Sequence, residues 1–256
     1  MINPLRKKYI KVKKLNAWRY RVIIASSAIV LAAFFFSKIE MEWANTLTQC
    51  VDVLGSVSII TAAILSLFCS CYHIEAEDDR RKMVIDNAFD TKFGEEKSFE
   101  YYTNDELKKG IDRLSANYFE SCFYTNHIAK SMVKGLRWKA VLLLIPFLCA
   151  IFFRDTNLFI LLTNIAIVSL VVSNWVRVEI LASKTKSIFE QYRTIYDNIL
   201  KKLDKSAKEG KMTQLILDYE AAISWSHILL DENIYKKHQK ELSCEWEVLK
   251  QSYKLS

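Results

Sequence analysis

The stretch that decides the fold is residues 51–72, which read VDVLGSVSIITAAILSLFCSCY. A helix needs about 20 mostly apolar residues to cross the hydrocarbon core of a bilayer, and this stretch meets that length. Three other apolar stretches accompany it, at residues 22–37, 140–153 and 158–175. The four stretches form two pairs with short connections. The sequence therefore predicts an all-α membrane protein with four transmembrane helices arranged as two hairpins.

The third stretch, at residues 140–153, needs a separate argument because its length also fits a buried core helix. Its connection to the fourth stretch, residues 154–157, is too short for one of the two to cross alone. Trp138 and the alkyl stems of Arg137 and Lys139 extend it, since long basic side chains reach toward the headgroups. We therefore interpret the third stretch as a span too, which brings the total to four.

The basic residues predict the orientation of these spans. Of the 36 Lys and Arg residues, eight precede residue 22, twelve lie between residues 73 and 139, and fourteen follow residue 175. Lys38 and Arg154 are the remaining two, in the short connections. Because basic loops stay on the cytoplasmic side, both termini and the central insert are expected in the cytoplasm.

These boundaries divide the chain into five segments. They are a basic cytosolic arm (1–21), a first transmembrane hairpin (22–72), a cytosolic helical insert (73–139), a second hairpin (140–176) and a cytosolic helical tail (177–256). The arm is interpreted mainly as a topology signal that also attracts anionic lipid.

The insert and the tail both carry helical patterns. In the insert, Thr103 and Glu106 are spaced as a capping box, and Gly135 is expected to end the helix that follows. Gly210 is expected to end a helix that continues from the fourth span. The apolar side chains of this continuing helix repeat at helical spacing. The same spacing predicts two tail helices, at about 212–225 and 232–253. Because such stripes must be buried, the insert and the tail are expected to pack together as one cytosolic helical domain.

Composition excludes several functions. The six cysteines include no CxxC pair, so no disulfide framework is expected. Cys71 lies two residues from both Cys69 and His73 and points to a different side of a helix, so no metal site is expected either. No phosphate-binding loop, zinc-protease or hydrolase motif occurs. We therefore expect no enzyme, no cofactor and no DNA binding.

The second span carries a face of small and polar residues that includes Gly55, Ser58 and Ser66. Such a face favours close helix packing, and the alternative is a surface that lines a conduit in a homo-oligomer. Asn164 in the fourth span is a further polar position that could bond across helices.

Three segments of the insert resemble a known family. They are VIDNAFDT at residues 84–91, YYTN at 101–104 and NYFESCF at 117–123. Together with the four-span topology, they are similar to the SMODS-associated four-transmembrane effectors of bacterial anti-phage signalling. The tail matches less well: the segment YRTIYD at 192–197 lacks the full pattern.

This resemblance implies a membrane effector of abortive infection. A cyclic oligonucleotide made after infection would bind the cytosolic domain, and the protein would then permeabilise the inner membrane. Phosphates need cations and bases need planar or amide side chains. The candidate nucleotide-binding residues are Lys97, Tyr101, Tyr102, Asn104, Arg113 and Asn117.

An alternative from another class remains open at this point. The chain could be a constitutive membrane scaffold without a nucleotide ligand, whose amphipathic tail helices bind a partner protein. For each candidate residue there is also a structural reading. Tyr118, for example, fits the buried stripe of its helix, and residues 80–82 fit a basic cluster next to the membrane.

Overall fold

The computed structural model describes residues 4–36, 42–94, 102, 104–152, 158–199 and 204–255. These residues are all-α, with six α-helices and no strand among them. Four helices are long, and two shorter helices follow a π-helical turn at Ile195–Ile199. Their bounds are α1 Pro4–Phe36, α2 Glu42–Phe89, α3 Ile111–Phe152, α4 Leu158–Thr194, α5 Lys205–Ser226 and α6 Glu232–Ser252.

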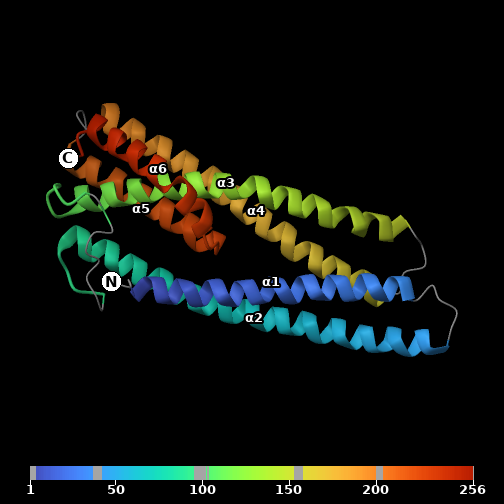
Figure 1. Ribbon diagram of the computed structural model, residues 1–256. Helices are drawn as coiled ribbons and strands as arrows, with labels where there is room; N and C mark the ends of the chain where they lie inside the picture. The colour runs from blue at the N-terminus through green and yellow to red at the C-terminus, as the bar shows by residue number, and fades with distance from the viewer. Residues whose placement is uncertain are drawn as a thin grey trace.

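The long helices form two antiparallel pairs, α1 with α2 and α3 with α4 (Figure 1). In the first pair, the Tyr9 hydroxyl meets Glu77 near one end, and Ile23 packs against Ala62 farther along. In the second pair, Asn126 donates to the Ala182 carbonyl and Arg137 pairs with Glu179. Both chain ends and the two short helices lie at the same end of the molecule (Figure 1).

Each predicted span is one part of a longer helix. The 48 residues of α2 extend over about 72 Å, roughly twice the thickness of a bilayer core. The helix therefore continues past residue 72 without a break and ends at Phe89. The same holds for α1, in which the basic segment from residue 4 to residue 21 is helical and packs along α2. No flexible joint separates the apolar stretches of α1 and α2 from their charged ends.

The insert and the tail share one hydrophobic core. It joins the end of α2, the first half of α3, the second half of α4, and α5 and α6. Phe119 lies at its centre, where its ring contacts Tyr192 at 5.1 Å and Trp246 at 5.3 Å between ring centroids. We call this unit the helical head and define it as residues 77–94, 102, 104–135, 178–199 and 204–255.

Capping side chains hold the two short helices of the head. Asp204 accepts a hydrogen bond from the Ala207 amide at 2.7 Å, and Asp231 accepts one from the Asn233 amide at 2.8 Å. His227 closes α5 in the left-handed region, with φ of 46°, and its amide bonds to the Ile223 carbonyl. The end of α5 and both ends of α6 match the tail helices predicted at about 212–225 and 232–253, whereas α5 begins at Lys205, earlier than predicted.

Two helix ends predicted from glycines are wrong. α3 runs through Gly135 to Phe152, and α5 runs through Gly210 to Ser226. A glycine costs only about 1 kcal/mol in a helix interior, and the packed neighbours of these helices outweigh that cost. The break that Gly210 was expected to mark comes earlier, after the π-helical turn at Ile195–Ile199.

The capping box predicted at Thr103 and Glu106 is also wrong, because α3 begins at Ile111. Thr103 lies outside the described residues, and Glu106 lies in an exposed turn. Asn104, which follows Thr103 in the sequence, hydrogen-bonds through its side chain to Asn117 and Glu120 inside α3 and does not cap the helix. Gly110, with φ of 132°, then redirects the chain into the helix.

The membrane prediction is supported for one helix. Within the part of the chain that the structure describes, the segment Gln49–Phe89 of α2 is long and apolar enough to cross a membrane by length and composition. Its most apolar window has a mean hydropathy of 2.1, and 17% of that window is buried in the molecule. The other three predicted spans stay predictions.

Candidate functional site

Four of the predicted nucleotide-binding residues come together where α2 and α3 meet. Tyr102, Asn104, Arg113 and Asn117 all lie in the loop after α2 or in the first two turns of α3, and all four are buried. Lys97 and Tyr101, the other two, lie outside the described residues. The structure places the four described candidates in the interior of the molecule.

A chain of buried amides connects the loop to both helices. The Asn104 amide group donates to the Asn117 side-chain oxygen at 3.1 Å and to Glu120 at 2.8 Å. Asn117 in turn donates to the Asn87 side-chain oxygen on α2 at 2.7 Å. Asn104 and Asn117 are fully buried, so these bonds hold the loop onto the two helices. We call Asn87, Asn104, Asn117 and Glu120 the asparagine cluster.

Asp86 organises the exit of the chain from α2. Its carboxylate accepts hydrogen bonds from the Thr91 hydroxyl at 2.6 Å and from the amides of Phe93 and Gly94 at 2.8 and 2.7 Å. The Gly110 amide donates to the Ala88 carbonyl at 2.8 Å, which ties the start of α3 to the end of α2. The loop is therefore anchored at both of its described ends.

Arg113 lies beside this cluster and pairs with Asp105. Its side chain is 10% exposed, and its Nε has no hydrogen-bond partner within the described residues. The side-chain oxygen of Asn104 is likewise a buried acceptor without a partner there. A buried guanidinium N–H and a buried amide oxygen are thus both unsatisfied at one place, which costs free energy unless another group meets them.

Several aromatic side chains of the head are core residues. Tyr118 is 3% exposed and contacts the ring of Tyr219 at 5.7 Å. Burial raises the pKa of Tyr118, Tyr192, Tyr196 and Tyr219, so all four stay uncharged. The structural reading of Tyr118 therefore fits better than a base-stacking role. The ring of Tyr124 contacts the ring of Tyr235, with centroids 6.0 Å apart.

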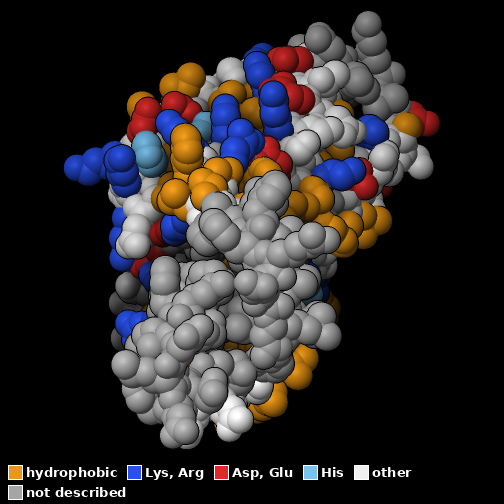
Figure 2. Space-filling model, turned by 90° about the vertical axis from the view of Figure 1, so that its right-hand side faces the viewer, with side chains coloured by type: hydrophobic (Ala, Val, Ile, Leu, Met, Phe, Trp, Pro, Cys, Tyr) orange, Lys and Arg blue, Asp and Glu red, His pale blue; other side chains and the backbone are white. Residues whose placement is uncertain are grey.

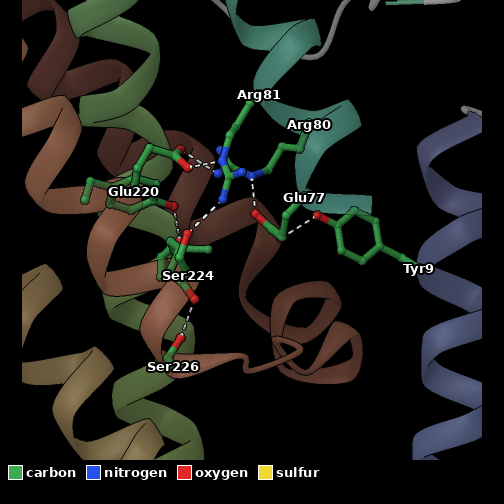
Figure 3. Close-up of polar contacts among 10 residues, drawn as sticks. Tyr9, Glu77, Arg80, Arg81, Glu220, Ser224 and Ser226 are labelled. Atoms are coloured by element: carbon green, nitrogen blue, oxygen red, sulfur yellow. Dashed lines mark hydrogen bonds and ion pairs between the residues drawn. The ribbon is translucent and has the colours of Figure 1, made fainter. Parts of the chain in front are cut away.

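A second polar group joins α1, α2 and α5, and the sequence pattern did not single it out (Figure 3). Arg80 donates to Glu77 at 2.7 Å and to Glu220 at 2.5 Å. Arg81 donates to the other oxygen of Glu220 at 2.7 Å and to the Ser224 hydroxyl at 2.8 Å. The Tyr9 hydroxyl of α1 donates to Glu77 at 2.7 Å.

We call Tyr9, Glu77, Arg80, Arg81 and Glu220 the ion network. The side chains of Arg80, Glu77 and Glu220 are only 13%, 10% and 15% exposed. Burial raises the pKa of Glu77, but the Arg80 charge and the hydrogen bonds from Tyr9 and Arg80 outweigh it, so the pKa is lowered overall. Residues 80–82, expected as a surface basic cluster, therefore split. Arg80 and Arg81 turn toward α5, and Lys82 pairs with Asp78 on the surface.

Two histidines lie next to this network, one helical turn closer to the apolar part of α2. The rings of His73 and His227 meet edge to face with centroids 5.5 Å apart. Burial, the neighbouring His73 and the charge of Arg177, in that order, lower the pKa of His227. The end of α5 is thereby placed against α2 at the residue that follows its apolar stretch.

The small-residue face of α2 contacts α1. Ala62 is buried against Ile23, and the Ser66 hydroxyl accepts a hydrogen bond from Arg19 at 3.3 Å. Gly55 is buried and Ser58 is half-buried. In the single chain this face is therefore largely a helix-packing surface. The side chain of Asn164, in α4, lies outside the described part.

The described residues of the head offer no metal site. No cluster of three or more His, Cys, Asp or Glu side chains that could hold a metal occurs there. The asparagine cluster and Arg113 can donate and accept hydrogen bonds, and they can meet a phosphate or a base edge. The chemistry available at this place is recognition.

Comparison with protein-family models, with curated proteins and with solved structures finds no match for this chain.

Proposed function

We propose that this protein is a membrane effector whose helical head senses a cyclic oligonucleotide and changes the arrangement of four membrane-crossing helices. It would act in a bacterial anti-phage signalling system and permeabilise the inner membrane, as a homo-oligomer with both termini in the cytoplasm. The observation that carries the proposal is continuity: α2 runs unbroken from its apolar stretch into the head, where α1 and α5 bind it through the ion network. A change in the head is thereby coupled to the apolar part of the molecule.

The surface of α2 supports a lipid environment for its apolar part. Its large apolar side chains are about half to two-thirds exposed in the single chain, and they recur from residue 53 to residue 68 of the helix. They are Val53, Leu54, Val57, Ile60, Ile64, Leu67 and Phe68. A soluble protein rarely exposes such a continuous apolar surface. Lipid chains, or further copies of the same chain within a membrane, would cover it.

The ligand is proposed to bind at Arg113 and Asn104. The unsatisfied Nε of Arg113 suits a phosphate oxygen, and the unsatisfied oxygen of Asn104 suits an amino group of a base. Asn104 is fully buried, so the ligand would have to compete with the asparagine cluster and release the turn at residues 104–110. Because Gly110 is bonded to Ala88 at the end of α2, that release would reach α2 directly.

The direct test is release of a dye from liposomes that carry the full-length protein, with a panel of cyclic di- and trinucleotides. We expect one member of the panel to cause release and the others to leave the dye inside. No release with any nucleotide, or release that does not depend on nucleotide, would overturn the messenger-gated function.

A matched pair of variants tests the site. Arg113→Ala is expected to abolish the nucleotide response while the protein still inserts into liposomes. Lys109→Ala is the control, because Lys109 is an exposed cation at the same turn and pairs with Asp90 on the surface. If Arg113→Ala responds as the parent protein does, the site assignment is wrong even where release itself is observed.

A second candidate function is favoured by the burial of the asparagine cluster. Buried amides that hydrogen-bond to one another, as Asn104 and Asn117 do, are common structural elements, and they need no ligand. On this reading the protein is a constitutive membrane scaffold that binds a partner through its tail helices. It predicts no toxicity on overexpression and a stable partner that is retained through α5 and α6. The release assay separates the two functions.

A further inference from the structure

The turn between α5 and α6, residues 227–231, lies at the level where the apolar stretches of the long helices end. The His227 ring contacts His73, which directly follows the last residue of the apolar stretch of α2. On α4, the charge of Arg177 acts on the same His227 ring, and Arg177 comes two residues after the apolar stretch of that helix. Two long helices thus place the turn at the same boundary.

The residues around this turn are unusually apolar for a helix connection. The sequence reads WSHILLD from residue 225 to residue 231. Trp225, in the last turn of α5, is 55% exposed. Ile228 and Leu230 pack partly against the core of the head, and Leu229 is half-exposed. The head therefore presents an indole and a leucine at the end that faces the apolar helices.

Basic and aromatic side chains gather at the same level. Lys13 of α1 pairs with Glu232 at the start of α6 at 2.9 Å, and Lys11 lies over the Tyr72 ring at 3.5 Å. Arg137 of α3 lies beside the Trp175 ring and pairs with Glu179. Figure 2 looks toward the head from the apolar ends of the helices and shows both apolar side chains and Lys and Arg side chains on this side of the head. Such a mixture is typical of the interface between hydrocarbon and water.

We propose that the α5–α6 turn, with Trp225, rests in the phospholipid headgroup layer of the membrane that the long helices cross. The headgroup region extends for roughly 5–7 Å beyond each side of the hydrocarbon core, which is the depth at which tryptophan and basic side chains collect. The inference rests on the membrane part of the proposed function and does not depend on a nucleotide. Anionic headgroups suit the occupant of this surface, because Lys13 pairs with Glu232 beside the turn and Lys11 lies over the Tyr72 ring at the end of the apolar stretch of α2.

This contact would couple the lipid surface to the ion network of the head. Ser224, which accepts the hydrogen bond from Arg81, directly precedes Trp225 in α5. One turn earlier in the same helix, Glu220 holds Arg80 and Arg81. A displacement of the turn out of the headgroups would therefore move the α5 partners of the ion network.

The test measures quenching of tryptophan fluorescence by brominated lipids. The full-length protein and the Trp225→Phe variant are reconstituted into phosphatidylcholine and phosphatidylglycerol vesicles that carry bromine near the headgroup. The difference between their spectra is the signal of Trp225. A third protein, Trp225→Phe with Leu217→Trp, moves the indole about 12 Å along α5 to another exposed apolar position farther from the turn.

We expect brominated lipid to remove most of the Trp225 signal and to leave the signal of the indole at position 217 almost unchanged. An unquenched Trp225 signal would overturn the inference, and so would equal quenching at both positions. The tryptophans that remain in Trp225→Phe, among them Trp18 and Trp138, report insertion itself. If they are quenched and Trp225 is not, the membrane part of the proposed function stands and the inference falls. If none is quenched, both fall.

Discussion

The guanidinium of Arg80 joins three helices of the molecule. It binds Glu77 on its own helix, Glu77 is held by Tyr9 of α1, and Glu220 brings in α5. Removing such a charge from water is costly, and good geometry with several hydrogen bonds only offsets that cost. The ion network therefore adds little net stability compared with an apolar core, but it is expensive to break on one side.

Glu220→Gln tests this asymmetry. The variant leaves Arg80 and Arg81 without their shared carboxylate in a nearly buried place, and we expect it to lower the free energy of unfolding by about 3 kcal/mol. The measurement is denaturant unfolding of the detergent-solubilised protein. Glu209→Gln on the same helix is the control, because its pair with Lys205 is exposed and is expected to contribute less than about 1 kcal/mol. Equal effects of the two variants would contradict the prediction.

Glu77 makes the stability of the head depend on pH in the acid range. Its pKa in the folded protein lies below the ordinary value of 4.5, so the unfolded state binds the proton more readily. The stabilisation is fully present above about pH 4.5 and is lost as the pH falls through the folded pKa. We expect Glu77→Gln to remove this part of the decrease in stability, measured as melting temperature against pH. Tyr9→Phe deletes one of the bonds that lower the pKa and brings the folded pKa closer to 4.5, so its loss of stability in acid should be smaller than in the parent protein and should end at a higher pH.

At the scale of the element, α2 carries two different surfaces along one helix. Ala62 is 5% exposed and packs against Ile23 of α1, whereas the neighbouring Ala63 is exposed. Farther along, the same helix leaves its apolar stretch and enters the ion network and the core of the head. Small residues on the α1 side permit close approach of the two helices, and large apolar residues on the other side are exposed in the single chain.

Ala62→Leu and Ala63→Leu separate these two surfaces. A leucine at position 62 would force α1 away from α2, and overpacking of this kind costs about 1–3 kcal/mol. A leucine at position 63 has free space, so the variant should match the parent protein. The measurement is the melting temperature of the purified protein in detergent. A larger loss for Ala63→Leu would show that the outward face of α2 is the tighter contact.

At the scale of the whole molecule, two exposed cysteines lie far apart, one in the first hairpin and the other in the head. Cys50 is near the start of α2, and Cys244 is on α6 in the head. If the head faces the cytoplasm, a membrane-impermeant maleimide added to intact spheroplasts should label Cys50 and not Cys244. Cys50→Ser should then lose the outside label and Cys244→Ser should keep it. The opposite pattern would reverse the orientation derived from the basic residues.

Parts of the head could be predicted from periodicity. The residues Leu114, Tyr118 and Cys122 of α3 and the residues Ile188, Tyr192 and Ile195 of the α4 end are buried, as their helical spacing indicated. The candidate site could be predicted only in part. The family-like segments contained Asn104 and Asn117, but nothing in the sequence indicated that the two amides bond to each other. Spacing along a chain does not show which polar side chains turn inward.

The sequence by itself determined the helical class, the positions of the apolar stretches and the asymmetry of the basic charges. These are properties of short segments, because the apolar length and the 3.6-residue period need no knowledge of distant residues. The tertiary structure alone decided that α3 passes through Gly135 and α5 through Gly210, and that Arg80 reaches Glu220 across 140 residues of chain. Packing decides such features, since its free energy exceeds local propensity and brings together groups that are far apart in the sequence.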